Sequence, residues 1–174
     1  VVGRLTCNPG GFGFVVPERG PGEAPASRSA DVYVAAVNLR DALHGDRVVA
    51  RVERRTAKGA EGRIIRVLER HLTRLVGRYE DDGKFGGHVV PFDKRILHEV
   101  FVPPGEAGQA AAGQMVVAEI TRPPSATRNP AGRVLQVLGR LEERGVDLRV
   151  VMAKHELLEA FPGEVEAEAG RVAV

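Results

Sequence analysis

The chain has 174 residues, enough for one domain or two small ones, and its net charge of +2 combines a basic region (residues 1–70 at +4, residues 71–141 at +2) with an acidic tail (residues 142–174 at −4). No run of about 18 apolar residues and no signal-peptide pattern is present, so a membrane-spanning helix and a membrane partner are not expected. The single cysteine, Cys7, cannot form an internal disulfide, which fits a cytoplasmic protein, and we interpret it as a small strand residue.

Four sequence motifs occur twice, in the same order. Their offset stays between 68 and 74 residues, which indicates one module duplicated in tandem rather than a short solenoid repeat. Gly3-Arg4 followed by Phe12–Pro17 recurs as Gly77-Arg78 followed by Phe85–Pro91. Asp31–Val34 recurs as Glu99–Val102, Gly45–Ala50 as Gly113–Ala118, and Gly62–Leu68 as Gly132–Leu138. We therefore predict domains at residues 1–70 and 71–141, followed by a tail at residues 142–174.

Each copy has the pattern of several short strands separated by turns. Val32 and Val34 flank Tyr33, so the valines are expected to face the core and the ring to face the other side, and Val100–Val102 repeats this arrangement. Turns are predicted at Asn8–Gly11 and Asp82-Gly83, and further strands over Arg47–Glu53, Ile64–Leu68, Met115–Thr121 and Val134–Leu138. About five strands in roughly 70 residues predict an all-β fold of two tandem five-stranded OB-fold barrels, followed by a short helical connector.

The two copies differ in their inserts. The segment Glu18–Ala30 is rich in Pro, Gly, Ala and Ser and is predicted to form a long flexible loop between the second and third strands of copy one. Copy two has the mixed-charge segment Asp93–His98 there. It also has one extra residue between Phe85 and Val89, which we interpret as a β-bulge.

After Leu141 the pattern becomes helical. Apolar residues recur at roughly helical spacing from Val146 to Phe161, and Pro162-Gly163 is predicted to end this helix. The acidic segment Glu164–Ala169 is interpreted as a second short helix or a frayed end. This tail is too small to fold alone, and the chain begins without methionine, so we expect a fragment in which the tail connects to a further domain.

Aromatic and basic residues in copy one suggest a nucleic-acid surface. Phe12 and Phe14 are two apart on one strand, and the three rings form a platform if Tyr33 projects on the same side. Bases stack on such rings with roughly 1–3 kcal/mol each and without sequence readout. The candidates for holding the phosphate backbone are Arg4, Arg47 and Arg51. The alternative is that one or more rings cap the barrel core.

The motifs Gly11–Val15 and Asp31–Val34 resemble the two ribonucleoprotein-type motifs of cold-shock domains. The resemblance implies an OB-fold that binds single-stranded RNA or DNA by stacking bases on the aromatic residues of its second and third strands. Free cold-shock proteins usually have histidine and phenylalanine just after the second motif, where this chain has Ala35 and Ala36. The platform is therefore expected to be thinner than in that family.

In copy two the matching candidates for RNA binding are Phe85, His88 and Phe101. We interpret His88 either as a base contact or as an ordinary exposed histidine. Copy two is predicted to bind RNA more weakly than copy one, or mainly to help form a channel with Arg78 and Lys84.

The order of these features resembles the amino-terminal half of the ribonuclease II / ribonuclease R family of 3′-to-5′ exoribonucleases. The features are two cold-shock-like copies, the turn His44–Val48, and a tail that runs from Val146-Asp147 through Phe161-Pro162 to Glu168-Ala169. In that family the cold-shock domains precede a catalytic domain in which aspartates hold Mg²⁺ for phosphodiester hydrolysis. The resemblance implies that this stretch captures single-stranded RNA and guides it to a catalytic domain of the same parent chain.

No catalytic residue, metal site or cofactor is predicted within this stretch. The acidic cluster Glu80–Asp82 belongs to a predicted hairpin turn, and Asp46 lies in another turn, where we expect local hydrogen bonding. The five histidines show no metal-ligand spacing with each other or with Cys7. This stretch is therefore not expected to cut RNA, and Mg²⁺ is expected only in the catalytic domain of the parent enzyme.

Two other functions stay open from the sequence. The chain is alternatively a stand-alone OB-fold RNA chaperone, or a protein-interaction module in which the copy with the poorer platform binds protein. A monomer is expected in each case. No motif determines the base preference or the freedom of the two copies about Glu69–Arg74.

Overall fold

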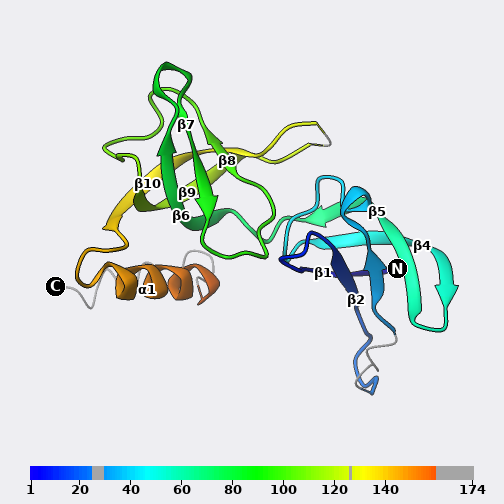
Figure 1. Cartoon of the computed structure of the whole chain (residues 1–174). Coiled ribbons are helices and arrows are strands. Elements are labelled where there is room, and N and C mark those ends of the chain that lie inside the picture. Colours follow the sequence, from blue (N-terminus) through cyan, green and yellow to red (C-terminus); the bar gives the residue numbers. More distant parts are fainter. Residues whose placement is uncertain (25–29, 126, 160–174) are drawn as a thin grey trace.

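The computed structural model describes residues 1–24, 30–125 and 127–159. Two closed five-stranded barrels are followed by a helix, which confirms the predicted fold class (Figure 1). Barrel 1 contains β1 (Val2–Cys7), β2 (Gly13–Pro17), β3 (Val32–Val34), β4 (Arg47–Thr56) and β5 (Gly59–Glu69). Barrel 2 contains β6 (Arg74–Asp81), β7 (Gly87–Pro91), β8 (Val100–Val102), β9 (Gln114–Arg122) and β10 (Ala131–Arg140). The helix α1 spans Val146–Glu159, and two short 3₁₀ turns, η2 (Ala36–Asn38) and η3 (Gly83–Phe85), lie between strands.

The two barrels have the same connectivity. In barrel 1 the strands close in the order β1-β2-β3-β5-β4, and barrel 2 repeats this as β6-β7-β8-β10-β9. The pairs β3–β5 and β8–β10 are parallel and the others are antiparallel. The registers correspond as well, because Arg4 pairs with Val16 in barrel 1 and Arg78 pairs with Val90 in barrel 2. The paired strand residues of one barrel therefore have structural counterparts in the other.

Strand alternation separates the cores from the outer faces. Val32 and Val34 are buried on either side of the partly exposed Tyr33. The counterparts Val100 and Val102 are also fully buried, whereas Phe101 is 38% exposed. The predicted orientation of these residues is confirmed. The third strands thus contribute valines to the cores and place one ring of each barrel outside.

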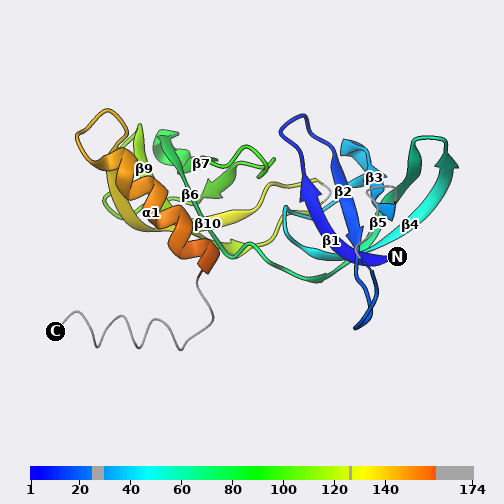
Figure 2. The same ribbon diagram turned by 90° about the horizontal axis from the view of Figure 1, so that it is seen from below.

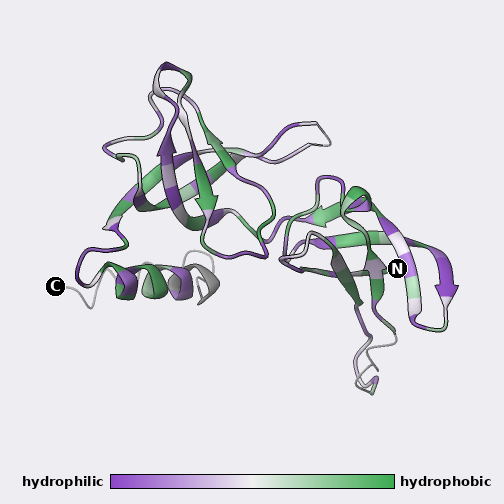
Figure 3. Cartoon of the chain, in the orientation of Figure 1, coloured by the Kyte–Doolittle hydropathy of each residue, from purple (hydrophilic) through white to green (hydrophobic). Residues whose placement is uncertain are grey.

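The hairpin of β4 and β5 extends further than the apolar pattern predicts. The predicted strand Arg47–Glu53 continues to Thr56, and its partner begins at Gly59 rather than at Ile64. Thr56 pairs with Gly59 across a two-residue turn, and a register shift follows Val52. The added part is rich in polar and glycine residues, which explains why hydrophobic alternation does not reveal it (Figure 3), although its β5 segment pairs with β3 and buries Ala60 in the core. We call residues 51–66 of this hairpin the β4–β5 ribbon.

The predicted β-bulge of copy two is wrong. The pairing of β6 with β7 runs without a shift from Gly77–Pro91 to Asp81–Gly87. No residue is inserted here, because Asn8–Phe12 and Asp82–Gly86 each connect the first two strands of their barrel over five residues. In barrel 2 this connection contains η3 in place of the expected tight turn at Asp82-Gly83. Gly86 has φ +96°, a conformation that suits glycine. The apparent extra residue arose from aligning Phe85 with Phe12, whereas the strand registers align Gly86 with Phe12.

The helix α1 packs on the outer face of barrel 2 (Figure 1 and Figure 2). The predicted helix is confirmed, and its buried residues Val146, Val150 and Ala153 form one apolar cluster with Val76 and Leu138. The predicted helix end at Pro162-Gly163 and the segment Glu164–Ala169 lie outside the described residues, as do positions 25–29 of the predicted β2–β3 loop. No helix in the described part of the chain has the length and apolar character needed to cross a membrane.

The segment between the barrels is held to barrel 1 by Asp46. This carboxylate is fully buried and accepts hydrogen bonds from the backbone of Leu43 and His71 and from the Arg70 guanidinium, at 2.8–3.0 Å. Local hydrogen bonding in the turn was expected, and the two contacts to the linker add to it. Gly45 leaves the space that the His71 ring occupies, because a Cβ atom there would lie 2.4 Å from it. The linker thus leaves barrel 1 in one defined direction.

Candidate nucleic-acid interface

The three aromatic residues predicted for barrel 1 form one cluster on its outer face. Phe14 on β2 pairs directly with Tyr33 on β3, and Phe12 immediately precedes β2. The ring centroids are 5.6–5.9 Å apart, with edge-on or tilted geometry. None of the rings belongs to the apolar core of barrel 1, which answers the alternative that they cap it. We call Phe12, Phe14 and Tyr33 the aromatic platform.

Glycines next to the platform set its shape. Gly13 faces the core, where a Cβ atom would lie 2.9 Å from the Leu5 side chain, so only the outer side of this segment bears large groups. Gly10 lies in the turn before the platform, and a Cβ atom there would meet the Phe12 ring at 3.0 Å. The backbone of Asn8 closes this turn by donating to the Phe12 carbonyl at 2.8 Å. Phe12 is therefore held against a tight turn, next to Phe14.

The three arginines predicted to hold phosphates differ in their partners. The Arg4 guanidinium donates to the Gly45 carbonyl at 2.7 Å. Arg47 is paired with Glu18, where one of its two bonds measures 3.0 Å, and with Glu69 at 3.3 Å. The bond from Arg47 lowers the pKa of Glu18, so this pair stays charged at neutral pH. Arg51 has no ion pair within the described part of the chain. Of the three arginines, Arg47 is therefore the one bound to carboxylates, whereas Arg4 donates to a neutral carbonyl and Arg51 has no side-chain partner among the described residues.

Basic residues on the β4–β5 ribbon were missing from the predicted set. Residues 51–66 contain six Lys and Arg against two Glu, a net charge of +4 that equals the net charge of residues 1–70. The two glutamates are paired, Glu53 with Arg63 and Glu61 with Arg54. The exposed Arg55, Lys58 and Arg66 have no ion pair within the described residues. The run Arg51–Arg55 is the sequence signal that could have revealed this surface.

The outer face of barrel 2 has a different composition at the same positions. His88 takes the place of Phe14, since it pairs with Phe101 as Phe14 pairs with Tyr33. Its Nδ1 atom lies 2.8 Å from Asp82 Oδ2, and its Nε2 atom lies 3.8 Å from Glu99 Oε2. His88 is therefore an acid-paired histidine on the outer face.

The predicted residues Phe85, Lys84 and Arg78 do not complete a second platform. Phe85 lies in η3 and is 69% exposed, with Lys84 Nζ 5.2 Å from its ring centre. Gly86 rather than Phe85 takes the position of Phe12, because β7 begins at Gly87. The Arg78 guanidinium is paired with Glu80. Phe101 is therefore the ring that barrel 2 presents on its strands at a platform position.

Two buried titratable groups of barrel 1 have structural roles. Cys7 lies in the core, and burial raises the pKa of its thiol to about 11, so it is protonated at neutral pH. The interpretation of Cys7 as a small strand residue is confirmed. His44 Nδ1 accepts the backbone N–H of Cys7 at 3.0 Å, and burial lowers the pKa of this imidazole. The neutral ring with its proton on Nε2 satisfies this bond.

The two barrels and the helix match families of known proteins. Residues 3–67 match the family model "Ribonuclease B OB domain", and residues 88–162 match the family model "Cold shock domain". Ribonuclease R of Acidithiobacillus ferrooxidans is 35% identical over 172 residues, which cover 97% of this chain and 37% of that protein. Ribonuclease R of Thermotoga maritima is 39% identical over 144 residues, or 82% of this chain and 20% of that protein. The chain thus spans well under half the length of these relatives.

Solved structures with the same fold support this assignment. Mycoplasma genitalium RNase R, in complex with ribose-methylated single-stranded RNA, superposes with a TM-score of 0.73 at 20% identity and covers the whole of this chain and 27% of that protein. A yeast pseudonuclease superposes over 87% of this chain with a TM-score of 0.67 at 17% identity. The fold is thus shared by a nuclease and a pseudonuclease. By its two barrels, the order of its motifs and its relatives, the chain belongs to the ribonuclease II / ribonuclease R family and corresponds to its amino-terminal tandem cold-shock region.

Proposed function

We propose that this chain is the RNA-capturing part of a ribonuclease R-like 3′-to-5′ exoribonuclease, and that it guides single-stranded RNA to a catalytic domain of the same protein. The observation that carries the proposal is the aromatic platform, whose three rings meet outside the barrel core. Rings on the outer strands of an OB-fold accept stacked bases. The relatives of this chain are ribonucleases, and one of the similar structures contains single-stranded RNA.

The charge distribution of barrel 1 supports the same function. Bases stacked on the platform leave their phosphates at the edges of the face, where cations retain RNA without reading its sequence. The basic β4–β5 ribbon continues from the platform, because Tyr33 pairs with Glu61 on β5. Arg51, Arg55 and Arg66 have no ion pair among the described residues and are available to phosphates. RNA is therefore expected to follow a path from the platform along this ribbon.

Hydrolysis belongs to another part of the parent enzyme in this proposal. The residues described by the structure contain no group of three His, Cys, Asp or Glu side chains that could hold a metal ion. The donor set for Mg²⁺ is thus missing from the described residues, and we assign no hydrolytic step to them. We expect this region to act in the cytoplasm as part of a monomer. Incubation of the chain with RNA and Mg²⁺ is expected to leave the RNA intact.

The test is fluorescence anisotropy with a labelled single-stranded RNA at low salt. Replacing Phe12, Phe14 and Tyr33 together by Ala is expected to weaken binding at least about tenfold, because each stacked base contributes roughly 1–3 kcal/mol. Phe92→Ala is the matched control, since Phe92 is a similarly exposed phenylalanine of barrel 2 that faces Lys154. Binding should also weaken as salt rises. Equal affinity of the triple variant and the wild type would contradict the proposal.

The alternative of a protein-binding role is favoured only for barrel 2. Its outer face is surrounded by the carboxylates Glu80, Asp81, Asp82 and Glu99, which repel phosphates. Chemical cross-linking of bound RNA, followed by mapping of the protected residues, distinguishes the two roles. Protection confined to barrel 1 would support a separate role for barrel 2.

A further inference from the structure

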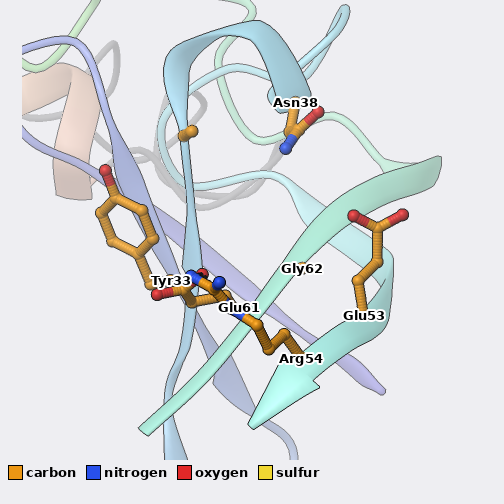
Figure 4. Close-up of a pocket in the computed structure, with 7 residues that line it drawn as sticks. Tyr33, Asn38, Glu53, Arg54, Glu61 and Gly62 are labelled. Carbon is orange, nitrogen blue, oxygen red and sulfur yellow. Dashed lines mark hydrogen bonds and ion pairs between the residues drawn. The ribbon is translucent and has the colours of Figure 1, made fainter. Parts of the chain in front are cut away.

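A pocket of about 280 Å³ opens beside the aromatic platform of barrel 1 (Figure 4). It is bounded by β3, η2 and the β4–β5 ribbon. Its lining includes Tyr33, Asn38, Glu53, Arg54, Glu61 and Gly62.

Tyr33 belongs to both the platform and the pocket. Its ring centre lies 5.6 Å from Phe12 and 5.7 Å from Phe14 on one side, and its side chain forms one wall of the pocket on the other. A base that stacks at the Tyr33 end of the platform therefore has its edge next to the pocket. Stacking alone does not distinguish bases, whereas hydrogen bonds to their edges do.

Two polar groups at the pocket have unused hydrogen-bonding capacity. The half-buried Asn38 amide has no side-chain hydrogen bond within the described residues, and it offers both a donor and an acceptor. Glu53 uses Oε1 to bind Arg63 Nε at 2.8 Å, while its second oxygen has no partner in the described part of the chain. Figure 4 shows the Asn38 amide and the Glu53 carboxylate on one side of the pocket and the Tyr33 ring on the other.

The neighbouring groups hold this arrangement in place. Arg54 donates from Nε and Nη2 to Glu61 Oε2, at 3.2 and 2.7 Å, so this guanidinium is committed to Glu61. Asn38 ends η2, and the next residue, Leu39, is buried in the core of barrel 1. The amide is therefore attached to a fixed part of the barrel. An edge-reading site needs such fixed donors and acceptors.

We propose that this pocket reads the edge of the base stacked on Tyr33 and favours a base with an exocyclic amine, so that cytosine binds better than uracil. The proposal rests on the RNA-binding function proposed above. In cytosine the N4 amine donates to the free oxygen of Glu53, and N3 accepts from the Asn38 amide. In uracil the O4 carbonyl takes the place of the amine and would face the carboxylate, oxygen against oxygen. A carboxylate that only accepts hydrogen bonds rejects that arrangement.

Barrel 2 lacks these groups at the corresponding positions. The pairing registers equate Glu53 with Thr121, and Glu61 with Ala131. Neither residue has a carboxylate, so the acceptor that would discriminate the bases is present in barrel 1 alone among these counterparts. Base preference is therefore expected to depend on barrel 1.

The test compares two oligoribonucleotides of about nine nucleotides, oligocytidine and oligouridine, in anisotropy titrations with the 174-residue chain. Both are pyrimidines with similar stacking surfaces, so their affinity ratio reports the edge contacts. The wild type is expected to bind oligocytidine roughly tenfold more tightly, the effect of one good hydrogen-bonded pair. Glu53→Gln is expected to bring this ratio close to one, whereas Asn38→Ala is expected to weaken both oligonucleotides, because the amide donates to cytosine N3 or accepts from uracil N3–H. The matched control Glu106→Gln, on an exposed loop of barrel 2, is expected to keep it.

The ratio is the decisive quantity because Glu53→Gln also releases Arg63, which strengthens binding of both oligonucleotides. Equal wild-type affinities for the two oligonucleotides would overturn the edge-reading proposal and leave the RNA-binding function in place. An unchanged ratio in Glu53→Gln would also overturn it. Failure of both oligonucleotides to bind the wild type would overturn the proposed function itself, and the edge-reading proposal with it.

Discussion

Barrel 1 and barrel 2 have the same strand order and register but different outer faces. Where barrel 1 has Phe14 on its second strand, barrel 2 has His88 between Asp82 and Glu99. Barrel 1 therefore offers a cluster of rings close to free cations, and barrel 2 offers the ring of Phe101 among carboxylates. The comparison shows that duplication preserved the inward positions, on which closure depends, and left the outward positions free to change.

The region around β1 and its counterpart β6 shows the same divergence. Val76 on β6 is 5% exposed because α1 covers it, together with Met115 and Val117. The register equates these residues with Val2, Arg47 and Val49 of barrel 1, and Val2 is 37% exposed. An apolar outer face in barrel 2 is thus explained by the helix that packs on it. In barrel 1 the corresponding face contains the Arg47–Glu18 ion pair instead.

The largest expected difference between the barrels concerns Asp46 and its counterpart Gln114. Asp46→Ala should lower the free energy of unfolding by about 3–5 kcal/mol, because it leaves two buried backbone donors without an acceptor and removes one of the two carboxylates that bind Arg70, the other being that of Asp41. Gln114→Ala should cost about 1 kcal/mol, since Gln114 accepts a single bond, from the Ala111 backbone. Urea unfolding followed by circular dichroism measures both.

Asp46→Asn provides the control for size, because the amide keeps one oxygen acceptor and loses the charge. The loss of unfolding free energy in Asp46→Asn should lie between the losses in Asp46→Ala and Gln114→Ala. Similar losses for Asp46→Ala and Gln114→Ala would show that the linker contacts contribute little to stability and that the two turns are energetically equivalent.

The core-facing residues could be predicted from the sequence because both barrels impose the same geometric constraints on them. A Cβ atom at Gly3 would lie 2.3 Å from the Val16 carbonyl oxygen, and one at Gly77 would lie 2.4 Å from that of Val90. Both barrels therefore require glycine at the same place, and the repeat is visible in the sequence. The alternation of valines around Tyr33 and Phe101 is also predictable, because successive residues of a strand face the barrel core and the solvent in turn.

The outer groups were harder to predict because they depend on the pairing of distant segments. The platform was predicted, since its rings lie in two short motifs. The interpretation of the extra residue near Phe85 as a bulge was wrong, because motif similarity aligns Phe85 with Phe12 whereas the strand registers align Gly86 with it. The pocket was not predicted at all. Asn38 and Glu53 are fifteen positions apart and meet only after β4 closes the barrel.

The second difference concerns the rings on the third strands of the two barrels. Tyr33→Ala should weaken binding of single-stranded RNA by about 1–3 kcal/mol, because it removes the ring that contacts both other platform rings. Phe101→Ala should change the affinity by less than about twofold, since its neighbours Glu99 and His88–Asp82 provide no phosphate contact. Anisotropy with the same RNA measures both variants.

A double variant sharpens this comparison from the opposite side. Asp82→Asn with Glu99→Gln removes two carboxylates from the face of barrel 2 and should strengthen RNA binding at low salt. Equal effects of Tyr33→Ala and Phe101→Ala would show that both barrels stack bases, and would contradict the division of roles between them.

The smallest expected difference concerns the ion pairs that follow β2 and β7. Asp93 is 17% exposed and is bound by Arg95 at 2.7 and 3.0 Å, with Lys154 of α1 at 3.8 Å. The bonds from Arg95 lower the pKa of Asp93 from 3.8 to about 2. A carboxylate with a lower pKa in the folded state stabilises the fold above its unfolded pKa, and this contribution is lost as the pH falls from about 4 to about 2.

Asp93→Asn should therefore lower the free energy of unfolding by roughly 1 kcal/mol at pH 7, and the difference from the wild type should shrink over that window. Glu18→Gln is the control, because the Glu18–Arg47 pair is exposed to solvent. This substitution should therefore leave the unfolding temperature at pH 7 unchanged. Thermal unfolding of both variants between pH 7 and pH 2 tests this prediction. A loss of stability in Asp93→Asn that stays constant down to pH 2 would mean that the Asp93 charge contributes nothing to holding α1 on barrel 2.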